Sequence, residues 1–169
     1  MKYTPRGYAP EAIEFVINKG RANLWLDPGL GKTSIVLSAL EILLLLGSTK
    51  FPVLVVAPKR VARSVWTDEG AKWDHLQHLD ISCMIGTAKE RYEAFMRPAP
   101  IYTINFENLP WLVNGCENDW PFKIVVADES TRLKGFRQIH GAKRAAALAK
   151  ACNLTARWLN LTGTPAPNG

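Results

Sequence analysis

One short stretch of the chain combines residue types that suit phosphate chemistry. Between two apolar runs, the segment DPGLGKT (residues 27–33) places two glycines directly before a Lys-Thr pair. A loop between a buried strand and a helix can turn its backbone N–H groups toward phosphate oxygens, and the helix dipole favours the same negative charge. Gly29 and Gly31 would let the backbone approach those oxygens. Lys32 would then reach the β- and γ-phosphates, and the Thr33 hydroxyl would ligate Mg²⁺.

This loop departs from the strict phosphate-loop pattern at its first position. In the pattern Gly-x4-Gly-Lys-[Ser/Thr], a glycine stands where this chain has Leu26. The remaining GLGKT also fits a glycine turn that only happens to precede a helix, so both readings are open at this point. The predicted phosphate-binding set is Pro28, Gly29, Leu30, Gly31, Lys32, Thr33 and Ser34.

Two acids end another apolar run, in the segment KIVVADES (residues 123–130). In a nucleoside-triphosphate site one acid holds Mg²⁺, often through water, and the next orients or deprotonates the attacking water. Acids at a strand end also occur as ordinary solvated loop residues. Because α/β sites form at the carboxyl ends of strands, we expect both motifs to share one site. Its predicted catalytic residues are Glu129, Asp128 and Lys32, and its predicted magnesium ligands are Thr33 and Asp128.

Alternating strand-like and helix-like segments surround these motifs. Unbroken apolar runs such as VLVVA and IVVA favour strands buried on both faces, which is typical of a parallel sheet. We therefore predict one three-layer α/β domain over residues 1–169, with a mainly parallel sheet flanked by helices. The expected strands are 24–26, 53–57, 81–85, 101–104, 124–127 and 158–161, and the expected helices are 10–18, 32–46, 60–71, 87–96 and 138–151. The segment 105–122 is the least regular part.

Composition limits the class of protein. A hydrophobic content of 47% with 21% charged residues is typical of a globular fold. No apolar stretch is long enough to span a bilayer and no signal peptide is evident, so we expect a soluble, cytoplasmic protein without a membrane partner. Cys83, Cys116 and Cys152 lie far apart, which favours reduced thiols over a disulfide or zinc site. The net charge of +6 permits a polyanionic partner.

Taken in order, five blocks of the chain resemble the first RecA-like lobe of superfamily-2 helicases, and most closely the Snf-type DNA translocases with their phage-encoded relatives. The blocks are DPGLGKT for motif I, VLVVAPKRVARSVWTDEGAKW for motif Ia, TINFENL near motif Ib, VVADESTRLKG for motif II and LNLTGTPAPNG for motif III. The resemblance implies a RecA-like P-loop domain that uses ATP and Mg²⁺ and acts on DNA.

The resemblance also implies roles for residues outside the phosphate loop. Thr162, Gly163 and Thr164 in the motif III block would couple the nucleotide site to the nucleic-acid track, although a plain turn closing a strand is the alternative. Lys59 and Arg60 would contact the nucleic-acid backbone, or else form the solvated first turn of a helix.

Further candidates carry weaker signals. Asn105 is a candidate for nucleic-acid contact. Trp66 and Trp73 are expected to pack in the core or between lobes rather than stack on bases. The basic residues Lys134, Arg137, Lys143 and Arg144 are expected to form a solvated face.

Three departures from the family pattern shape the expectations. Ala9 and Pro10 stand near the place of the glutamine that usually reads adenine, so adenine recognition would be weaker or would come from Tyr8 stacking or Arg6. Motif II ends in Ser130 and Thr131 rather than Ala-His, which puts its contact with motif III in doubt. The sequence ends directly after the motif III block, so we expect the second lobe and its arginine fingers to be absent.

The sequence therefore predicts the ATP-binding lobe of a Snf-like DNA translocase that requires a second RecA-like lobe in cis or in trans. For this chain alone we expect nucleotide binding, weak DNA binding and little or no turnover. One alternative is a non-enzymatic module that binds DNA or protein in a nucleotide-dependent way. Another is a different P-loop class, such as a small-molecule kinase, which would leave the Thr-Gly-Thr-Pro ending unexplained.

Overall fold

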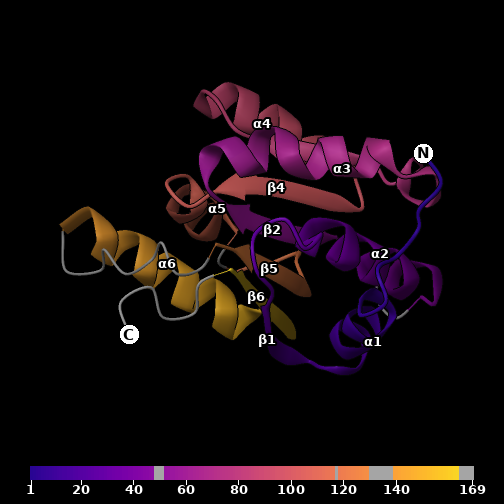
Figure 1. Ribbon diagram of the computed structural model, residues 1–169. Coiled ribbons are helices and arrows are strands. Elements are labelled where there is room, and N and C mark those ends of the chain that lie inside the picture. Colours follow the sequence, from indigo (N-terminus) through magenta and orange to yellow (C-terminus); the bar gives the residue numbers. More distant parts are fainter. Residues whose placement is uncertain (48–51, 117, 130–138, 164–169) are drawn as a thin grey trace.

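A six-stranded parallel sheet forms the centre of the protein (Figure 1). The computed structural model describes residues 1–47, 52–116, 118–129 and 139–163. The strand order is β1-β6-β5-β2-β4-β3, and every described pair is parallel. The strands are β1 (Arg21–Trp25), β2 (Val53–Ala57), β3 (Ile81–Met84), β4 (Ile101–Asn105), β5 (Ile124–Asp128) and β6 (Arg157–Thr162).

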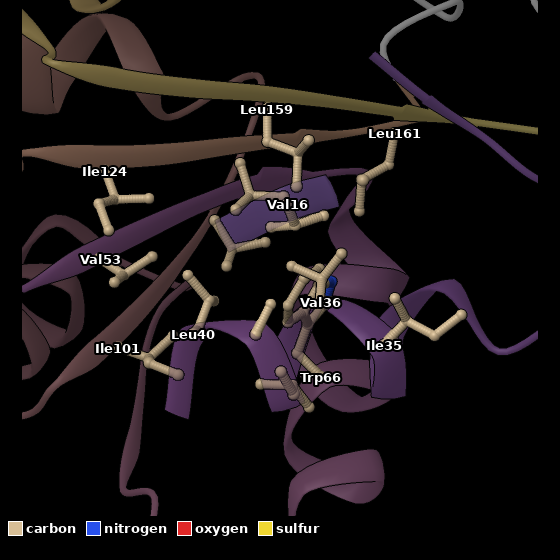
Figure 2. Close-up of a cluster of buried hydrophobic side chains, with 14 of the residues drawn as sticks. Val16, Ile35, Val36, Leu40, Val53, Trp66, Ile101, Ile124, Leu159 and Leu161 are labelled. Atoms are coloured by element: carbon tan, nitrogen blue, oxygen red, sulfur yellow. The ribbon is translucent and has the colours of Figure 1, made fainter. Parts of the chain in front are cut away.

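One face of the sheet is covered by the helices nearest the N-terminus. These are α1 (Ala9–Asn18), α2 (Lys32–Leu45), a π-helical turn (Val61–Val65) that leads into α3 (Trp66–Lys72), and a short 3-10 turn (Asp74–Leu76). Figure 2 shows the core of this layer, where side chains of α1, α2 and α3 point toward residues of the strands. Trp66 is fully buried in it. This packing fixes α2 against the sheet, and with it the loop that precedes α2.

The opposite face is covered by α4 (Ala88–Met96), α5 (Leu109–Gly115) and α6 (Ile139–Leu154). In Figure 1, α5 and α6 lie across the sheet from α1 and α2. Aromatic side chains fill much of this layer. The centroid of the Phe122 ring lies 5.2 Å from that of Trp120 and 5.7 Å from that of Tyr102, and both pairs pack edge to face. Because helices cover both faces, every residue of β2, β4 and β5 is buried.

The predicted three-layer α/β class is confirmed, and two of the differences in detail have a clear physical reason. β1 begins three residues earlier than expected and ends before Leu26. As an edge strand it alternates exposed residues with half-buried or buried ones, so its polar Arg21 and Asn23 broke the apolar run that the prediction relied on. The second difference is α5, which lies inside the segment predicted to be irregular. Its Pro110 occupies the first turn, where proline is tolerated.

Two other expectations concern the chain as a whole. Cys83, Cys116 and Cys152 are free thiols, as predicted. Within the described ranges, no helix has both the length and the hydropathy that crossing a bilayer requires.

Candidate functional site

The loop between β1 and α2 adopts the turn that its glycines suggest. Gly29 and Gly31 have φ values of 81° and 74°, a left-handed conformation that side chains disfavour. The Leu30 N–H donates to the carbonyl of Asp27 at 3.3 Å and closes the turn. Leu26 lies outside the left-handed region, and its N–H donates to the Thr162 carbonyl as a continuation of the β1–β6 pairing. A glycine is therefore unnecessary at that position.

The first turn of α2 leaves its backbone donors without a side-chain cap. The carbonyl of Gly31 accepts the first helical hydrogen bond, from the Ile35 N–H at 3.0 Å. No side chain caps this end of α2 within the described residues, and its first turn contains no acidic residue. The N–H groups at the start of a helix have no intrahelical partner and favour an anion. These donors fit the phosphate groups of a nucleotide.

Lys32 extends its ammonium group over the same loop. Its Nζ donates to the carbonyl of Leu26 and, at 3.0 Å, to that of Asp27. Partial burial lowers the pKa of Lys32 from its ordinary value of 10.5, and the nearby Asp128 carboxylate opposes that shift most strongly. The loop thus holds a positive charge beside its backbone donors, as phosphate binding requires.

Asp128 ends β5 almost fully out of solvent, with 6% of its surface exposed. Its carboxylate accepts hydrogen bonds from Trp66 Nε1 at 3.1 Å and from the Glu129 N–H at 2.9 Å. Burial nevertheless raises the pKa of Asp128 above its ordinary value of 3.8. The folded state therefore loses stability as the pH rises from 3.8 through the raised pKa, because ionisation leaves a buried negative charge. A bound cation would compensate that charge.

Glu129 follows directly in a left-handed conformation, with φ of 52°. It is the one non-glycine residue with positive φ in the part of the chain that the structure describes. Backbone strain of this kind is most common at functional sites. The chain turns directly after β5, and Glu129 is half-buried whereas Asp128 is buried.

The end of β6 directly contacts the loop between β1 and α2, which is called the phosphate loop below. A Cβ at Gly163 would lie 2.8 Å from Pro28 Cδ and 3.3 Å from Pro28 N, closer than side chains normally approach. Thr162 is buried just before it. Only a glycine lets these two segments meet at this distance. Thr164, the third residue predicted for coupling, lies outside the described residues.

A cavity of about 420 Å³ opens beside the loop. The residues Gly29 to Ser34 line it together with Arg6 and Tyr8, so the cavity brings together most of the set assigned to a nucleotide from the sequence, whereas Pro28 does not line it. The Tyr8 hydroxyl donates to the Leu30 carbonyl at 2.8 Å. The lining also includes Tyr3, Thr4, Val65, Glu69, Lys72 and Trp73, which the sequence did not indicate as nucleotide contacts, although the last four lie in the motif Ia block.

A second cavity, of about 930 Å³, lies at the carboxyl ends of β2, β3 and β4. Lys59 and Asn105, predicted independently as nucleic-acid contacts, both line it, whereas exposed Arg60 does not. Asn105 donates to Glu107 at 2.6 Å, and Glu107 in turn pairs with Arg144 at 3.1 Å. Arg144 had been expected on a solvated face, and its pairing with Glu107 was not foreseen.

The remaining predictions divide between described and undescribed residues. Trp66 and Trp73 both pack as expected: Trp66 in the core, and Trp73 against Tyr3 with ring centroids 5.1 Å apart. Lys143 is exposed, as predicted. The predictions for Ser130, Thr131, Lys134 and Arg137 fall outside the described residues.

The site offers few protein ligands for a metal ion. Among the described residues, no group of three or more His, Cys, Asp or Glu side chains could hold a metal. Thr33 at the start of α2 and Asp128 at the end of β5 supply oxygen atoms, which Mg²⁺ prefers. Mg²⁺ commonly takes its other ligands from water and substrate phosphates, so this limited set fits its chemistry.

The architecture and the loop define a RecA-like P-loop domain. The family model of the SNF2-related domain matches residues 21–169. The chain belongs to this family.

Two relatives extend beyond the chain. It is 48% identical over 169 residues to putative protein p41 of Acyrthosiphon pisum secondary endosymbiont phage 1, a match that covers 99% of the chain and 37% of that protein. It is 31% identical over 158 residues to the Bos taurus SWI/SNF-related matrix-associated actin-dependent regulator of chromatin subfamily A-like protein 1, covering 91% of the chain and 15% of that protein. The chain thus spans little more than a third of the phage relative.

Solved structures share the fold. The Sulfolobus solfataricus SWI2/SNF2 ATPase core, solved with dsDNA, matches with a TM-score of 0.76 at 22% identity, over 99% of this chain and 34% of that one. The UvsW helicase from bacteriophage T4 matches with a TM-score of 0.67 at 16% identity, over 96% of this chain and 53% of that one. At these identities the likeness establishes the fold alone.

Proposed function

We propose that the chain is the ATP-binding lobe of a Snf-type superfamily-2 DNA translocase, which couples hydrolysis of ATP with Mg²⁺ to movement on DNA. The observation that most supports this proposal is the uncapped first turn of α2, with the Lys32 ammonium over the loop and Asp128 close enough to affect its pKa. Backbone donors, a cation and a buried carboxylate are the groups that a nucleoside triphosphate with Mg²⁺ requires.

The proposed roles follow from the chemistry of each group. The N–H groups of Gly31 to Ser34 and the Lys32 ammonium bind phosphate oxygens. The Thr33 hydroxyl and the Asp128 carboxylate hold Mg²⁺, which when bound neutralises charge that develops on the phosphates. Glu129 orients a water molecule and takes its proton. Thr162 and Gly163 transmit movement of the loop to β6, because Gly163 abuts Pro28.

The DNA-binding part of the proposal rests on the second cavity. Lys59 and Asn105 line it at the same edge of the sheet as the phosphate loop. The exposed Lys59 ammonium is typical of contacts to a nucleic-acid backbone, whereas Asn105 is buried and its side-chain amide already hydrogen-bonds with Glu107 and Asn108. The Sulfolobus structure that shares this fold was solved with dsDNA, which supports DNA as the partner.

Turnover is proposed to need a second lobe. An arginine finger contributes about 10³- to 10⁵-fold to rate in related nucleotide hydrolases. The relatives are much longer than this chain, so they have room for such a lobe. We propose that the chain alone binds nucleotide with little turnover, and that a partner lobe in cis or in trans restores it.

Calorimetric titration with a non-hydrolysable ATP analogue and Mg²⁺ tests the nucleotide site. Lys32→Ala should weaken binding by about 100-fold or more, because the substitution removes the cation over the loop. Its melting temperature in nucleotide-free buffer should stay close to that of the unmodified chain. The control is Lys19→Ala, which removes an exposed positive charge at the end of α1. Equal affinity in the two variants would remove Lys32 from the site.

A further inference from the structure

The Tyr8 hydroxyl reaches the phosphate loop from a separate element. It donates to the Leu30 carbonyl at 2.8 Å, across 22 residues of sequence. Leu30 lies between the two left-handed glycines of the loop. The bond therefore acts on the most sharply turned part of the predicted phosphate cradle.

Tyr8 is held in place by its own surroundings. It is the residue before α1, and its carbonyl accepts the first helical bond from the Ala12 N–H at 3.1 Å. The next residue, Ala9, is buried, and its N–H donates to the Arg6 carbonyl at 2.8 Å. The Tyr8 ring itself packs against the core that α1, α2 and the sheet share. The hydroxyl is thus presented from a fixed position.

The segment before Tyr8 is also fastened, at its far end, to the end of α3. The N-terminal ammonium group of Met1 donates to the Lys72 carbonyl at 2.7 Å, and the Met1 carbonyl accepts from the Asp74 N–H at 3.0 Å. The Tyr3 N–H donates to the Asp74 carboxylate at 3.2 Å. Residues 1–8 therefore form a strap between α3 and the loop, with Tyr8 at the loop end.

The trans geometry of the peptide bond lets the Tyr8 hydrogen bond fix the direction of the Gly31 N–H. The described part of the chain contains no cis peptide bond. The Leu30 carbonyl and the Gly31 N–H therefore point in opposite directions within one peptide plane. A bond that holds the carbonyl toward Tyr8 holds the Gly31 N–H away from it. That N–H belongs to the uncapped start of α2.

We infer that Tyr8 is a positioning residue for phosphate binding: its hydroxyl fixes the Leu30–Gly31 peptide so that the Gly31 N–H faces the phosphate groups. The inference rests on the proposed nucleotide site. It assigns Tyr8 a role in binding phosphate, which differs from stacking on adenine as expected from the sequence. The two roles use different parts of the side chain, because positioning needs the hydroxyl and stacking needs the ring.

Tripolyphosphate and a non-hydrolysable ATP analogue, each titrated with Mg²⁺, separate the two roles. Tyr8→Phe keeps the ring and removes the hydroxyl, and should weaken binding of both probes by about 3- to 10-fold, the usual effect of one hydrogen bond. Tyr92→Phe is the matched control, because Tyr92 lies exposed on α4, does not line this cavity, and its hydroxyl makes no hydrogen bond within the described residues. Tyr92→Phe should bind both probes as the unmodified chain does.

A measurement without ligand gives a second readout. In a ¹H–¹⁵N spectrum of the free protein, the Gly31 amide resonance should shift or broaden in Tyr8→Phe and stay unchanged in Tyr92→Phe. An unchanged Gly31 resonance in Tyr8→Phe would overturn the inference.

The outcomes also separate this inference from the proposed function. If Tyr8→Phe binds both probes normally while Tyr8→Leu loses affinity for the ATP analogue only, Tyr8 stacks on the base and does not position the loop. If Lys32→Ala binds tripolyphosphate as well as the unmodified chain, the phosphate site itself is wrong and the inference fails with it.

Discussion

Helices α2 and α4 both begin at the carboxyl edge of the sheet, close to a glycine with positive φ. α4 follows Gly86, with φ of 129°, and its first turn is closed by a capping box. The Glu90 N–H donates to Thr87 Oγ1 at 3.3 Å, and the Thr87 N–H donates to the Glu90 carboxylate at 2.6 Å. α2 follows Gly31 and has no such cap within the described residues.

We interpret this difference as one between a structural helix start and the start that we propose binds phosphate. At α4 the protein's own side chains satisfy the backbone donors, and the Glu90 carboxylate repels a second anion. At α2 the donors remain available and a lysine stands beside them. Both starts line cavities at the same edge, so a cavity alone does not identify the phosphate site. The state of the helix cap distinguishes the two starts, and it supports the proposed phosphate site at α2.

The largest effect in this comparison is expected from Gly163→Ala. The added methyl group would lie 2.8 Å from Pro28 Cδ and would push the loop before α2 out of place. We expect about 10-fold or weaker nucleotide binding and a loss of about 1–3 kcal/mol in the free energy of unfolding, as is usual for overpacking. Calorimetry and urea denaturation measure the two effects.

Gly115→Ala is the control for that substitution, because a Cβ at Gly115 would meet no atom within 4 Å. It should leave both quantities close to those of the unmodified chain. Normal nucleotide affinity in Gly163→Ala would show that the contact between β6 and the loop is dispensable for binding.

A smaller effect is expected at the second cavity. The backbone N–H groups at the start of α4 are capped, so an anion there would be bound by side chains. Lys59→Ala should weaken DNA binding by about 3- to 10-fold and lower the slope of log affinity against log salt by about 1. Arg60→Ala should change both less, because Arg60 does not line the cavity. Fluorescence anisotropy with a labelled duplex over a salt series measures both quantities.

Lys89→Ala controls for loss of charge at that surface, since Lys89 lies exposed on α4 beside Glu93. It should alter the salt slope little. Equal effects of Lys59→Ala and Lys89→Ala would mean that DNA affinity depends on the net charge of the surface and not on the cavity.

The smallest effect is expected from Thr87→Ala, which opens the cap of α4. The free energy of unfolding should fall by about 0.5–1 kcal/mol at pH 7, with nucleotide affinity unchanged. Hydrogen bonds from the Thr87 N–H and hydroxyl lower the pKa of Glu90 below its ordinary value of 4.5. The stability that this carboxylate adds is present above pH 4.5 and is lost as the pH falls through the lowered pKa.

The difference between Thr87→Ala and the unmodified chain should therefore shrink in acid, as measured by denaturation at pH 7 and pH 3. Thr87→Ser keeps a hydroxyl and should behave as the unmodified chain at both values. A nucleotide affinity that changed in Thr87→Ala would contradict the division between the two helix starts.

The sequence predicted those parts of the molecule that one local segment determines. The loop before α2 is one segment, and its glycines, lysine and threonine have fixed spacing, so their placement followed from the motif. The buried strands were equally clear, because their apolar runs are unbroken. β1 was misplaced because an edge strand contains polar residues, and α5 was missed because its Pro110 and aromatic residues resemble a loop.

Other features could not be predicted because they join segments far apart in sequence. The hydrogen bond from Trp66 to Asp128 spans 62 residues, and the pair of Glu107 with Arg144 spans 37. Neither the types of these residues nor their spacing in the sequence predicts such contacts. The close approach of Gly163 to Pro28 is also of this kind, and only the parallel pairing of β1 with β6 explains it.

The place of β1 in the sheet has a consequence for deuterium exchange. β1 pairs with β6, and no strand flanks its other side among the described residues, whereas β2 and β5 are paired on both sides. Outward-facing amides of β1 should therefore take up deuterium earlier than those of β2. The loop between β1 and α2 directly follows β1. A ligand that stabilises this loop should therefore slow deuterium uptake in β1 and leave uptake in β2 unaltered.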